Sequence, residues 1–269
     1  MNARLRLRSL LDQGRPAGGL FLSLPAPGII EIAAVAGFDF VMIDLEHTLI
    51  GGRELEELIA AADRSGVSAL VRVAEARSER ILPVLDAGAA GIVVSRASSV
   101  EDAREAIRRA RYAPLGSRGL NAGRLGRFGD CDLPALLQRL DRETLVIALI
   151  EDPAGLAVAE EMASLPGLDG LLLGAADYSQ SIGLPWQTTA EPVQAANRQL
   201  AAVARRTRRY FFAIPRRDED VADHLREGAL GIVVANDRGL LRQALSSKDR
   251  FWRDIYREHG SAGGGETKS

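Results

Sequence analysis

The sequence predicts a single-domain (β/α)8 barrel, and three observations support this prediction. The chain of 269 residues contains eight short apolar segments, each followed by a segment with helical spacing. The apolar segments lack strict alternation, which is typical of parallel strands covered on both faces. Polar residues follow several of them at the same end, where barrel enzymes carry their active sites. The alternative, a doubly wound open sheet, usually has a glycine-rich nucleotide loop after its first strand, unlike L-S-L-P-A-P-G at 22–28.

The composition is that of an ordinary globular protein, with 46% apolar and 26% charged residues. A net charge of −2 gives no reason to expect nucleic acid or an anionic membrane as a partner. The single cysteine, Cys131, excludes an internal disulfide framework and a cysteine-rich zinc site, and it fits a reducing compartment. No apolar run approaches the roughly 20 residues that span a bilayer. Residues 4–13 have the pattern of an amphipathic helix, not of a signal peptide, so we expect a cytoplasmic location.

The expected elements follow from local patterns along the chain. Short runs of branched and aromatic side chains predict strands, and i, i+3, i+4 spacing predicts helices, several of which end at a glycine. The expected strands are 19–24, 38–44, 68–73, 91–95, 144–150, 170–173, 210–214 and 231–235. The expected helices are 4–13, 29–35, 54–65, 78–87, 100–111, 133–140, 155–162, 192–208, 221–227, 238–245 and 249–258. The barrel domain with its terminal helices therefore covers 1–259, and the low-complexity segment 260–269 is expected to be disordered.

Segment 112–132 interrupts this regular pattern with five glycines and three arginines, at 118, 124 and 127. A long loop without its own structure in a compact domain is usually functional or disordered. The arginines favour a functional loop, and a flexible surface loop is the alternative.

Titratable residues follow the predicted strands. Asp44, Glu46 and His47 come after strand 38–44, and Arg72 stands near the end of strand 68–73. Buried charge is costly, so we expect these groups to face water, a metal or a substrate at the mouth of the barrel. Glu151 follows strand 144–150, and Asp177 lies in the loop after strand 170–173.

Glu151 and Asp177 are hard oxygen donors, which suit Mg²⁺ or Mn²⁺ better than zinc. Because they follow neighbouring strands, the pair predicts a divalent metal site, with Mg²⁺ preferred and Mn²⁺ or Co²⁺ possible. The alternative is that each acid caps or begins a helix.

The remaining candidates suit an anionic substrate. Arg72 lies in an otherwise apolar strand and needs an anion, either a substrate carboxylate or a structural partner such as Glu46 or Asp44. His47 is the candidate general base, whereas we expect His224 and His259 to be solvated surface residues. The small residues Gly174, Ala175 and Ala176 would let backbone N–H groups approach a substrate carboxylate.

These groups together favour chemistry on a 2-oxo acid, which can chelate a metal through its carboxylate and keto oxygens. The metal and an arginine would then stabilise the enolate that forms when a C–C bond breaks. The only lysines are Lys248 and Lys268, and neither lies at a strand end, which argues against a Schiff-base aldolase.

From about residue 5 to 247, the sequence resembles the HpcH/HpaI family of metal-dependent 2-oxo-acid aldolases. The resemblance is carried by F-D-F-V-M-I-D-L-E-H at 38–47, R-V at 72–73, L-D-A-G-A-A-G-I-V-V at 85–94, Y-A-P-L-G-S-R-G at 112–119, I-E-D at 150–152 and G-A-A-D at 174–177. It implies a barrel of the phosphoenolpyruvate/pyruvate-binding type, a divalent metal on Glu151 and Asp177, and a substrate arginine at Arg72.

The resemblance also implies that His47 is the base and that Asp44 orients it. It places Asp86 in a neighbouring subunit's site, within a hexamer built as a trimer of dimers that exchange their last helix. Glu46, Arg118 and Arg124 are expected around the same sites, in their own or a neighbouring subunit.

The chain departs from the family pattern at several positions. Leu149 stands where the aldolases usually have glutamine, and Ala175 stands where they usually have proline. Strand 210–214 is followed by P-R-R-D, with Arg216 and Arg217 unusually basic. Extra arginines near a metal site favour a substrate with several carboxylates.

The expected function is therefore carbon–carbon bond cleavage of a 4-hydroxy-2-oxo acid. A first alternative is the condensation of oxaloacetate with acetyl-CoA to citrate, as in siderophore-pathway members of the family. A second, of a different class, is a 2-oxo-acid binding protein without turnover, and the joint presence of His47, Arg72, Glu151 and Asp177 argues against it.

Overall fold

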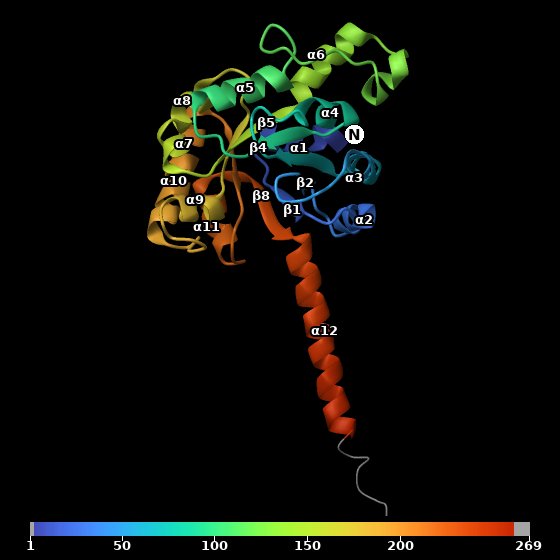
Figure 1. The fold of residues 1–269 in the computed structure, drawn as a ribbon, viewed down its shortest axis with the longest axis vertical. Coiled ribbons are helices and arrows are strands. Elements are labelled where there is room, and N and C mark those ends of the chain that lie inside the picture. The colour runs from blue at the N-terminus through green and yellow to red at the C-terminus, as the bar shows by residue number, and fades with distance from the viewer. Residues whose placement is uncertain (1–2, 261–269) are drawn as a thin grey trace, which may run out of the picture.

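A computed structural model describes residues 3–260, and its eight parallel strands close into a barrel surrounded by helices (Figure 1). Each strand pairs with the next one along the chain, and the last pairs with the first. The predicted barrel is thus confirmed, and most of the expected tail lies outside the described residues. The strands are β1 (Ala17–Leu22), β2 (Phe40–Asp44), β3 (Ser68–Val73), β4 (Gly91–Val94), β5 (Leu145–Ile150), β6 (Gly170–Leu173), β7 (Tyr210–Ala213) and β8 (Ala229–Asn236).

The helices connect these strands along the outside of the barrel (Figure 1). They are α1 (Ala3–Asp12), α2 (Pro27–Val35), α3 (Gly52–Ser65), α4 (Ile81–Ala87), α5 (Val100–Ala110), the 3-10 helix η1 (Arg124–Gly129), α6 (Leu133–Glu143), α7 (Pro153–Ala157), α8 (Ala159–Ser164), α9 (Ala175–Ser181), α10 (Glu191–Thr207), α11 (Asp220–Glu227) and α12 (Asp237–Gly260). Within residues 3–260, no helix combines the length and the apolar character needed to cross a membrane.

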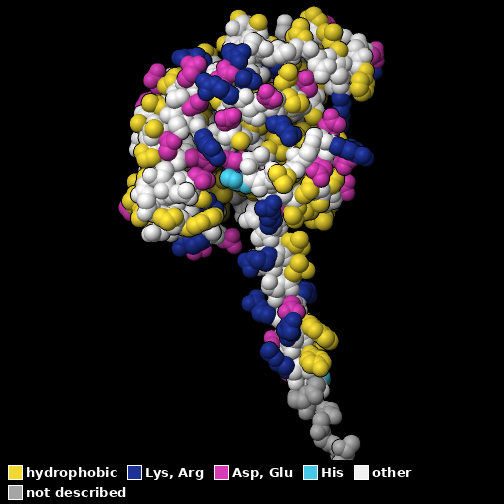
Figure 2. Space-filling view, in the orientation of Figure 1, with side chains coloured by type: hydrophobic (Ala, Val, Ile, Leu, Met, Phe, Trp, Pro, Cys, Tyr) yellow, Lys and Arg dark blue, Asp and Glu magenta, His cyan; other side chains and the backbone are white. Residues whose placement is uncertain are grey.

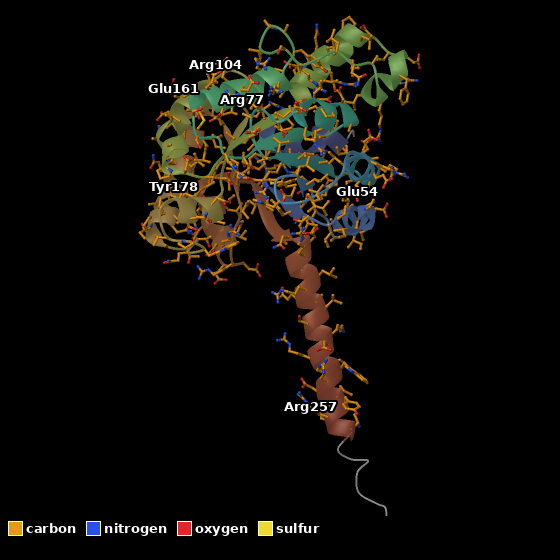
Figure 3. The ribbon with its side chains drawn as sticks, in the orientation of Figure 1. Glu54, Arg77, Arg104, Glu161, Tyr178 and Arg257 are labelled. Carbon is orange, nitrogen blue, oxygen red and sulfur yellow. The ribbon has the colours of Figure 1, made fainter. Side chains whose placement is uncertain are left out.

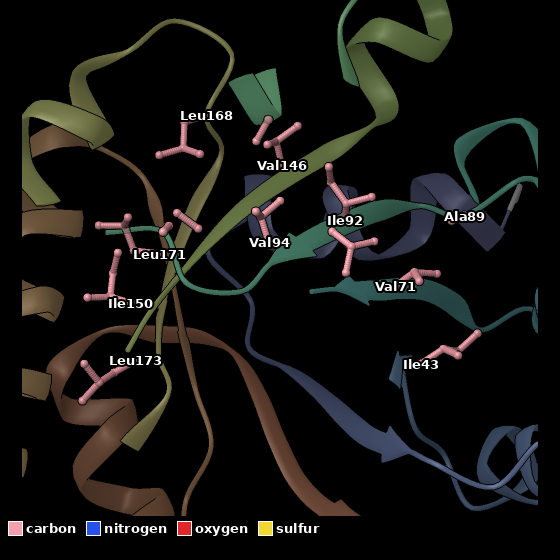
Figure 4. Packing of buried hydrophobic residues seen from close by; sticks show 14 of the residues in the cluster. Ile43, Val71, Ala89, Ile92, Val94, Val146, Ile150, Leu168, Leu171 and Leu173 are labelled. Carbon is pink, nitrogen blue, oxygen red and sulfur yellow. The ribbon is translucent and has the colours of Figure 1, made fainter. Parts of the chain in front are cut away.

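Two shells of apolar side chains explain why the strands read as unbroken apolar runs. In β2, Phe40 and Met42 belong to the cluster inside the barrel, whereas Val41 and Ile43 belong to the cluster between strands and helices. Figure 4 shows part of this outer cluster, including Ile43. Because side chains alternate along a strand and both faces are covered, every position of β2 is buried.

Two glycines leave space for the largest rings inside the barrel. Phe40 and Phe212 meet edge to face with ring centroids 6.3 Å apart. An added Cβ at Gly19 would overlap the Phe40 ring, and one at Gly231 would overlap the Phe212 ring. The barrel interior therefore holds two aromatic rings that need bare backbone on the neighbouring strands.

Helix α1 covers the amino-terminal end of the barrel. Its Leu7 and Leu11 join the interior cluster. Asp169, just before β6, accepts hydrogen bonds from Arg8 (2.8 Å), Arg111 (2.5 Å) and the Val146 amide (2.8 Å). With this end closed by packing and ion pairs, the carboxyl end of the strands is the end that can receive a ligand.

Some expected elements differ in the structure. The two closing helices expected at 238–245 and 249–258 form one helix, α12, because Ser246, Ser247 and Lys248 include no helix breaker. Segment 112–132 contains the 3-10 helix η1, and the helix expected at 155–162 divides at Val158 into α7 and α8. The segment after β6, expected to be a loop, begins α9 at Ala175.

Replacing Gly231 with alanine should lower the free energy of unfolding by about 1–3 kcal/mol, because the added methyl group overlaps the Phe212 ring. Gly18→Ala is the matched control, since no atom lies within 4 Å of its added Cβ. Urea unfolding followed by circular dichroism measures both variants. Equal midpoints would contradict the steric role of Gly231.

Candidate active site

The expected strand-end residues gather at the open end of the barrel. Asp44 is the last residue of β2 and pairs in register with Arg72 of β3. Glu151 directly follows β5, and Asp177 lies in the first turn of α9, which follows β6. Parallel strands place all four residues at one rim, as the sequence predicts.

Arg72 is the centre of a buried ion cluster. Its Nε and Nη2 each lie 2.9 Å from Asp44 Oδ1, and its Nη1 lies 3.1 Å from Glu46 Oε2. The guanidinium also stacks on the Phe21 ring, 4.8 Å from its centroid. Only 10% of the Arg72 side chain is exposed. Burial and these partners together hold the planar guanidinium group in one orientation. The structural ion pair considered for Arg72 is therefore present, and it involves both acids.

His47 is positioned through its backbone and by Glu46. Asp44 Oδ1 accepts hydrogen bonds from the amides of Glu46 (2.9 Å) and His47 (3.4 Å). The imidazole Nε2 lies 3.7 Å from Glu46 Oε2, and 55% of this side chain is exposed. Asp44 thus fixes the turn that carries the histidine, and Glu46 is the acid beside its ring.

Two site residues after β4 were not identified from the sequence, namely Ser95 and Arg96. Ser95 Oγ donates a hydrogen bond of 2.7 Å to Glu46, and Arg96 Nε lies 3.5 Å from the other oxygen of that carboxylate. The Arg96 amide donates to Glu151 Oε2 at 2.7 Å from a left-handed backbone conformation (φ 55°). The sequence signal that could have identified them is their position at the end of the expected strand 91–95.

Glu151 lies in a confined space shared with other acids. Burial, with the nearby charges of Glu46 and Asp177, raises the pKa of Glu151 to about 7. A Cβ on Gly174 would stand 2.6 Å from Glu151 Cγ, so only glycine permits this packing. Carboxylates held close together in a buried site are stabilised by a cation.

The donor set fits a hard divalent cation. Within residues 3–260, no three or more His, Cys, Asp or Glu side chains converge on a candidate metal centre. Mg²⁺ commonly takes one or two carboxylates and completes its shell with water and substrate oxygens, so Glu151 and Asp177 suffice. The alternative capping role belongs to Asp152, which accepts from the Gly155 amide at the start of α7, and not to Glu151. For Asp177 the alternative role does apply, because this residue lies in the first turn of α9.

The other predicted residues lie away from this rim. Arg118 pairs with Asp86 of α4 at 2.9 Å, and Arg124 pairs with Asp63 of α3 at 3.0 Å. Asp86 and Arg124 line an open pocket of about 800 Å³ between these helices and η1. Within one chain, the structure therefore does not bring Asp86, Arg118 or Arg124 to the strand-end site.

The prediction for His224 is wrong, because its side chain is buried. It lies where α11 packs on α10, with Nδ1 3.2 Å from Asn197 Nδ2 and 3.4 Å from Glu227 Oε2. His259 is exposed, as expected.

The fold and the charges at its open end are those of a class II aldolase barrel, a lyase that acts on 2-oxo acids. The chain belongs to the HpcH/HpaI aldolase/citrate lyase family, whose model matches residues 18–244. A hydroxypyruvate/pyruvate aldolase of Deinococcus radiodurans is 31% identical over 255 residues, which cover 92% of this chain and 90% of that protein.

Solved structures agree with this assignment. The citrate synthase SbnG superposes with a TM-score of 0.86 and 34% identity, over 93% of this chain and 98% of that one. An HpcH/HpaI aldolase from Desulfitobacterium hafniense superposes with a TM-score of 0.88 and 25% identity, over 93% and 97% of the two chains. The likeness thus extends over nearly the whole barrel in both cases.

Glu151→Gln should weaken Mg²⁺ or Mn²⁺ binding by at least about tenfold, because it removes one charged oxygen donor. Asp152→Asn removes the same charge one residue away but keeps a helix-capping side chain, so its metal affinity should be unchanged. Isothermal titration calorimetry measures both affinities. Unchanged affinity in Glu151→Gln would show that the ligand is another residue.

Proposed function

We propose that the protein is a divalent-metal-dependent aldolase that cleaves a 4-hydroxy-2-oxo acid into pyruvate, or a related 2-oxo acid, and an aldehyde. The observation that carries the proposal is the buried carboxylate of Glu151, with the charge of Asp177 nearby, at the same rim as the fixed guanidinium of Arg72. The names of the aldolase relatives support the same reaction class.

Glu151 and Asp177 would hold the metal, with Mg²⁺ preferred and Mn²⁺ or Co²⁺ as alternatives. When bound, a divalent ion there supplies charge that favours the enolate of a chelated 2-oxo acid. Ala175 and Ala176 would contribute backbone N–H groups for the substrate carboxylate, since they form the first turn of α9. The Gly174 amide, expected to contribute as well, instead donates to the Ile150 carbonyl at 2.9 Å.

Arg72 would stabilise the enolate oxygen as the C3–C4 bond breaks. Asp44 and Glu46 already fix the fork, so little reorganisation is needed when negative charge develops. His47 would take the proton of the C4 hydroxyl, while the electron pair of the broken bond passes to C3 and the aldehyde leaves. Protonation of the enolate at C3 then releases the 2-oxo acid.

Condensation of oxaloacetate with acetyl-CoA to citrate is the second candidate. The specific observation is Leu149, which stands where the family's aldolases usually have glutamine. Leu149 is buried with the apolar cluster inside the barrel, so this position offers no polar group to a substrate. The identity of 34% to a citrate synthase favours the same candidate.

Product analysis by mass spectrometry should separate the two candidates in the Mg²⁺-loaded protein. One arm receives pyruvate with aldehydes, and the other receives oxaloacetate with acetyl-CoA. We expect an aldol product in the first arm, and citrate alone would assign the second reaction. Arg72→Lys keeps the charge but not the fork, so it should lose most activity in either arm. No product in either arm from the wild-type protein would contradict both candidates.

We also propose that α12 assembles copies of the chain. In Figure 1 this helix projects from the barrel, and its contacts with the barrel strands are to β1 and β8. Figure 3 shows Arg257 near the far end of α12, away from the barrel body. The helix therefore does not cover the outside of β8 as the other helices cover their strands.

Both α12 and the barrel expose apolar side chains that a second copy would bury. Figure 2 shows hydrophobic side chains along one side of α12 and basic ones along the other. Exposed apolar residues on α12 are Leu240, Leu241, Leu245, Phe251, Trp252, Ile255 and Tyr256, and on α2, α11 and β8 they are Ile32, Val35, Leu225 and Val234. Exchange of α12 between two copies would cover both sets, and three such dimers would form the hexamer that the family resemblance implies.

Size-exclusion chromatography with light scattering should give the mass of a hexamer for the full chain. Ile255→Asp should reduce this mass, because it places a charge in the apolar stripe. Arg250→Ala is the control on the other side of α12 and should leave the mass unchanged. A monomeric wild-type chain would contradict the proposal.

A further inference from the structure

The chain leaves the regular path of a strand at Arg96, just after β4. In a strand, the N–H groups of residues two apart point toward the same neighbouring strand. Here the Ser95 amide donates to the Val73 carbonyl of β3 at 3.0 Å, whereas the Ala97 amide donates to the Leu149 carbonyl of β5 at 3.1 Å. The backbone therefore turns between these two amides, and Arg96 has the left-handed φ of 55° that makes this turn.

The packing around this turn holds it in place. A Cβ on Gly155, in the short helix α7, would stand 2.4 Å from the Ala97 carbonyl oxygen, so the segment after Arg96 lies directly against α7. A left-handed conformation is uncommon for a residue with a Cβ, and it persists where the surrounding structure determines it. Such residues gather at functional sites, which makes the contacts of Arg96 a candidate for function.

The turn directs the Arg96 amide at Glu151. This N–H donates to Glu151 Oε2 at 2.7 Å, and among residues 3–260 no other donor reaches the carboxylate. Glu151 is buried, and its other oxygen faces bare backbone, since a Cβ on Gly174 would stand 2.8 Å from Oε1. Each oxygen of the carboxylate thus lies next to a fixed piece of main chain.

The Arg96 side chain has a different neighbour. Its guanidinium is 70% exposed, and its Nε lies 3.5 Å from Glu46 Oε1. The other oxygen of Glu46 receives Ser95 and Arg72. The guanidinium therefore belongs to the ion cluster of Arg72, whereas the main chain of the same residue serves Glu151. Substitution can separate the two contacts, because the main-chain N–H remains when the side chain is replaced.

We propose that Arg96 is a positioning residue of the cation site: its main-chain N–H, directed by the left-handed turn, holds the Glu151 carboxylate in the orientation in which it binds the metal. This inference rests on the metal-binding role proposed for Glu151. Hydrogen-bond partners that orient a ligating group commonly contribute about 10–100-fold to metal affinity. Residue 96 acts here through its backbone conformation, and its guanidinium is not required for cation binding.

The test removes this N–H while leaving the rest of the site unchanged. Arg96→Gly keeps the N–H and readily adopts the left-handed conformation. Its counterpart carries glycolic acid at position 96, introduced by nonsense suppression in cell-free translation, so that an ester oxygen replaces the N–H. Electron paramagnetic resonance of the free ion measures Mn²⁺ binding by each full-length protein.

Arg96→Gly should bind Mn²⁺ as the wild-type protein does. The ester at position 96 should bind Mn²⁺ about 10–100-fold more weakly than Arg96→Gly, because Glu151 has lost its hydrogen-bond donor. The matched control carries lactic acid in place of Ala97. This ester loses the hydrogen bond to Leu149 at the same strand end but leaves the donor to Glu151, so its Mn²⁺ affinity should equal that of the wild type.

Equal Mn²⁺ affinities of Arg96→Gly and its ester would overturn the role of the amide. A loss that is as large in the Ala97 ester would also overturn it, since any damage to this strand end would then suffice. A loss already present in Arg96→Gly would assign the effect to the guanidinium instead. A wild-type protein that binds no Mn²⁺ would overturn the metal-binding role of Glu151 itself. These measurements need no turnover, so failure of the proposed reaction in the product analysis remains a separate result.

Discussion

The buried ion cluster of Arg72 with Asp44 and Glu46 is the interaction on which the site depends. It joins the ends of β2 and β3, and through Glu46 it reaches Ser95 and Arg96 after β4. Removing one member of such a cluster leaves an uncompensated buried charge, which costs about 3–5 kcal/mol. The cluster therefore orders three consecutive strand ends and the turn that carries His47, in addition to orienting the guanidinium.

The two ends of the barrel use charge in different ways. At the amino-terminal end, Asp169 receives Arg8, Arg111 and a backbone amide, so its charge is neutralised within the chain. At the carboxyl end, Glu151 has one backbone donor, and nearby acids help to raise its pKa to about 7. Negative charge is thus less completely compensated at the carboxyl end, where a cation would be useful. The first arrangement stabilises the fold, and the second prepares a binding site.

The sequence predicted the barrel and the strand-end residues Asp44, Arg72 and Glu151 because apolar runs and the charges that follow them are local features. It did not predict the contact of the Arg96 amide with Glu151, which depends on a left-handed backbone that no periodicity encodes. The burial of His224 depends on how α11 packs against α10, so it could not be read from α11 alone. Similarly, the partners of Arg118 and Arg124 come from helices far away in the sequence.

The contact between Gly174 and Glu151 links the site to the motion of a helix. Gly174 precedes α9, and its Cα faces the Glu151 side chain with no space for a further carbon atom. A shift of the carboxylate toward this backbone must therefore be matched by a shift of the start of α9. Since α9 also carries Asp177, a shift of this helix also changes the distance between the carboxylates of Glu151 and Asp177. A ligand that changed the distance between these carboxylates would therefore also move the start of α9.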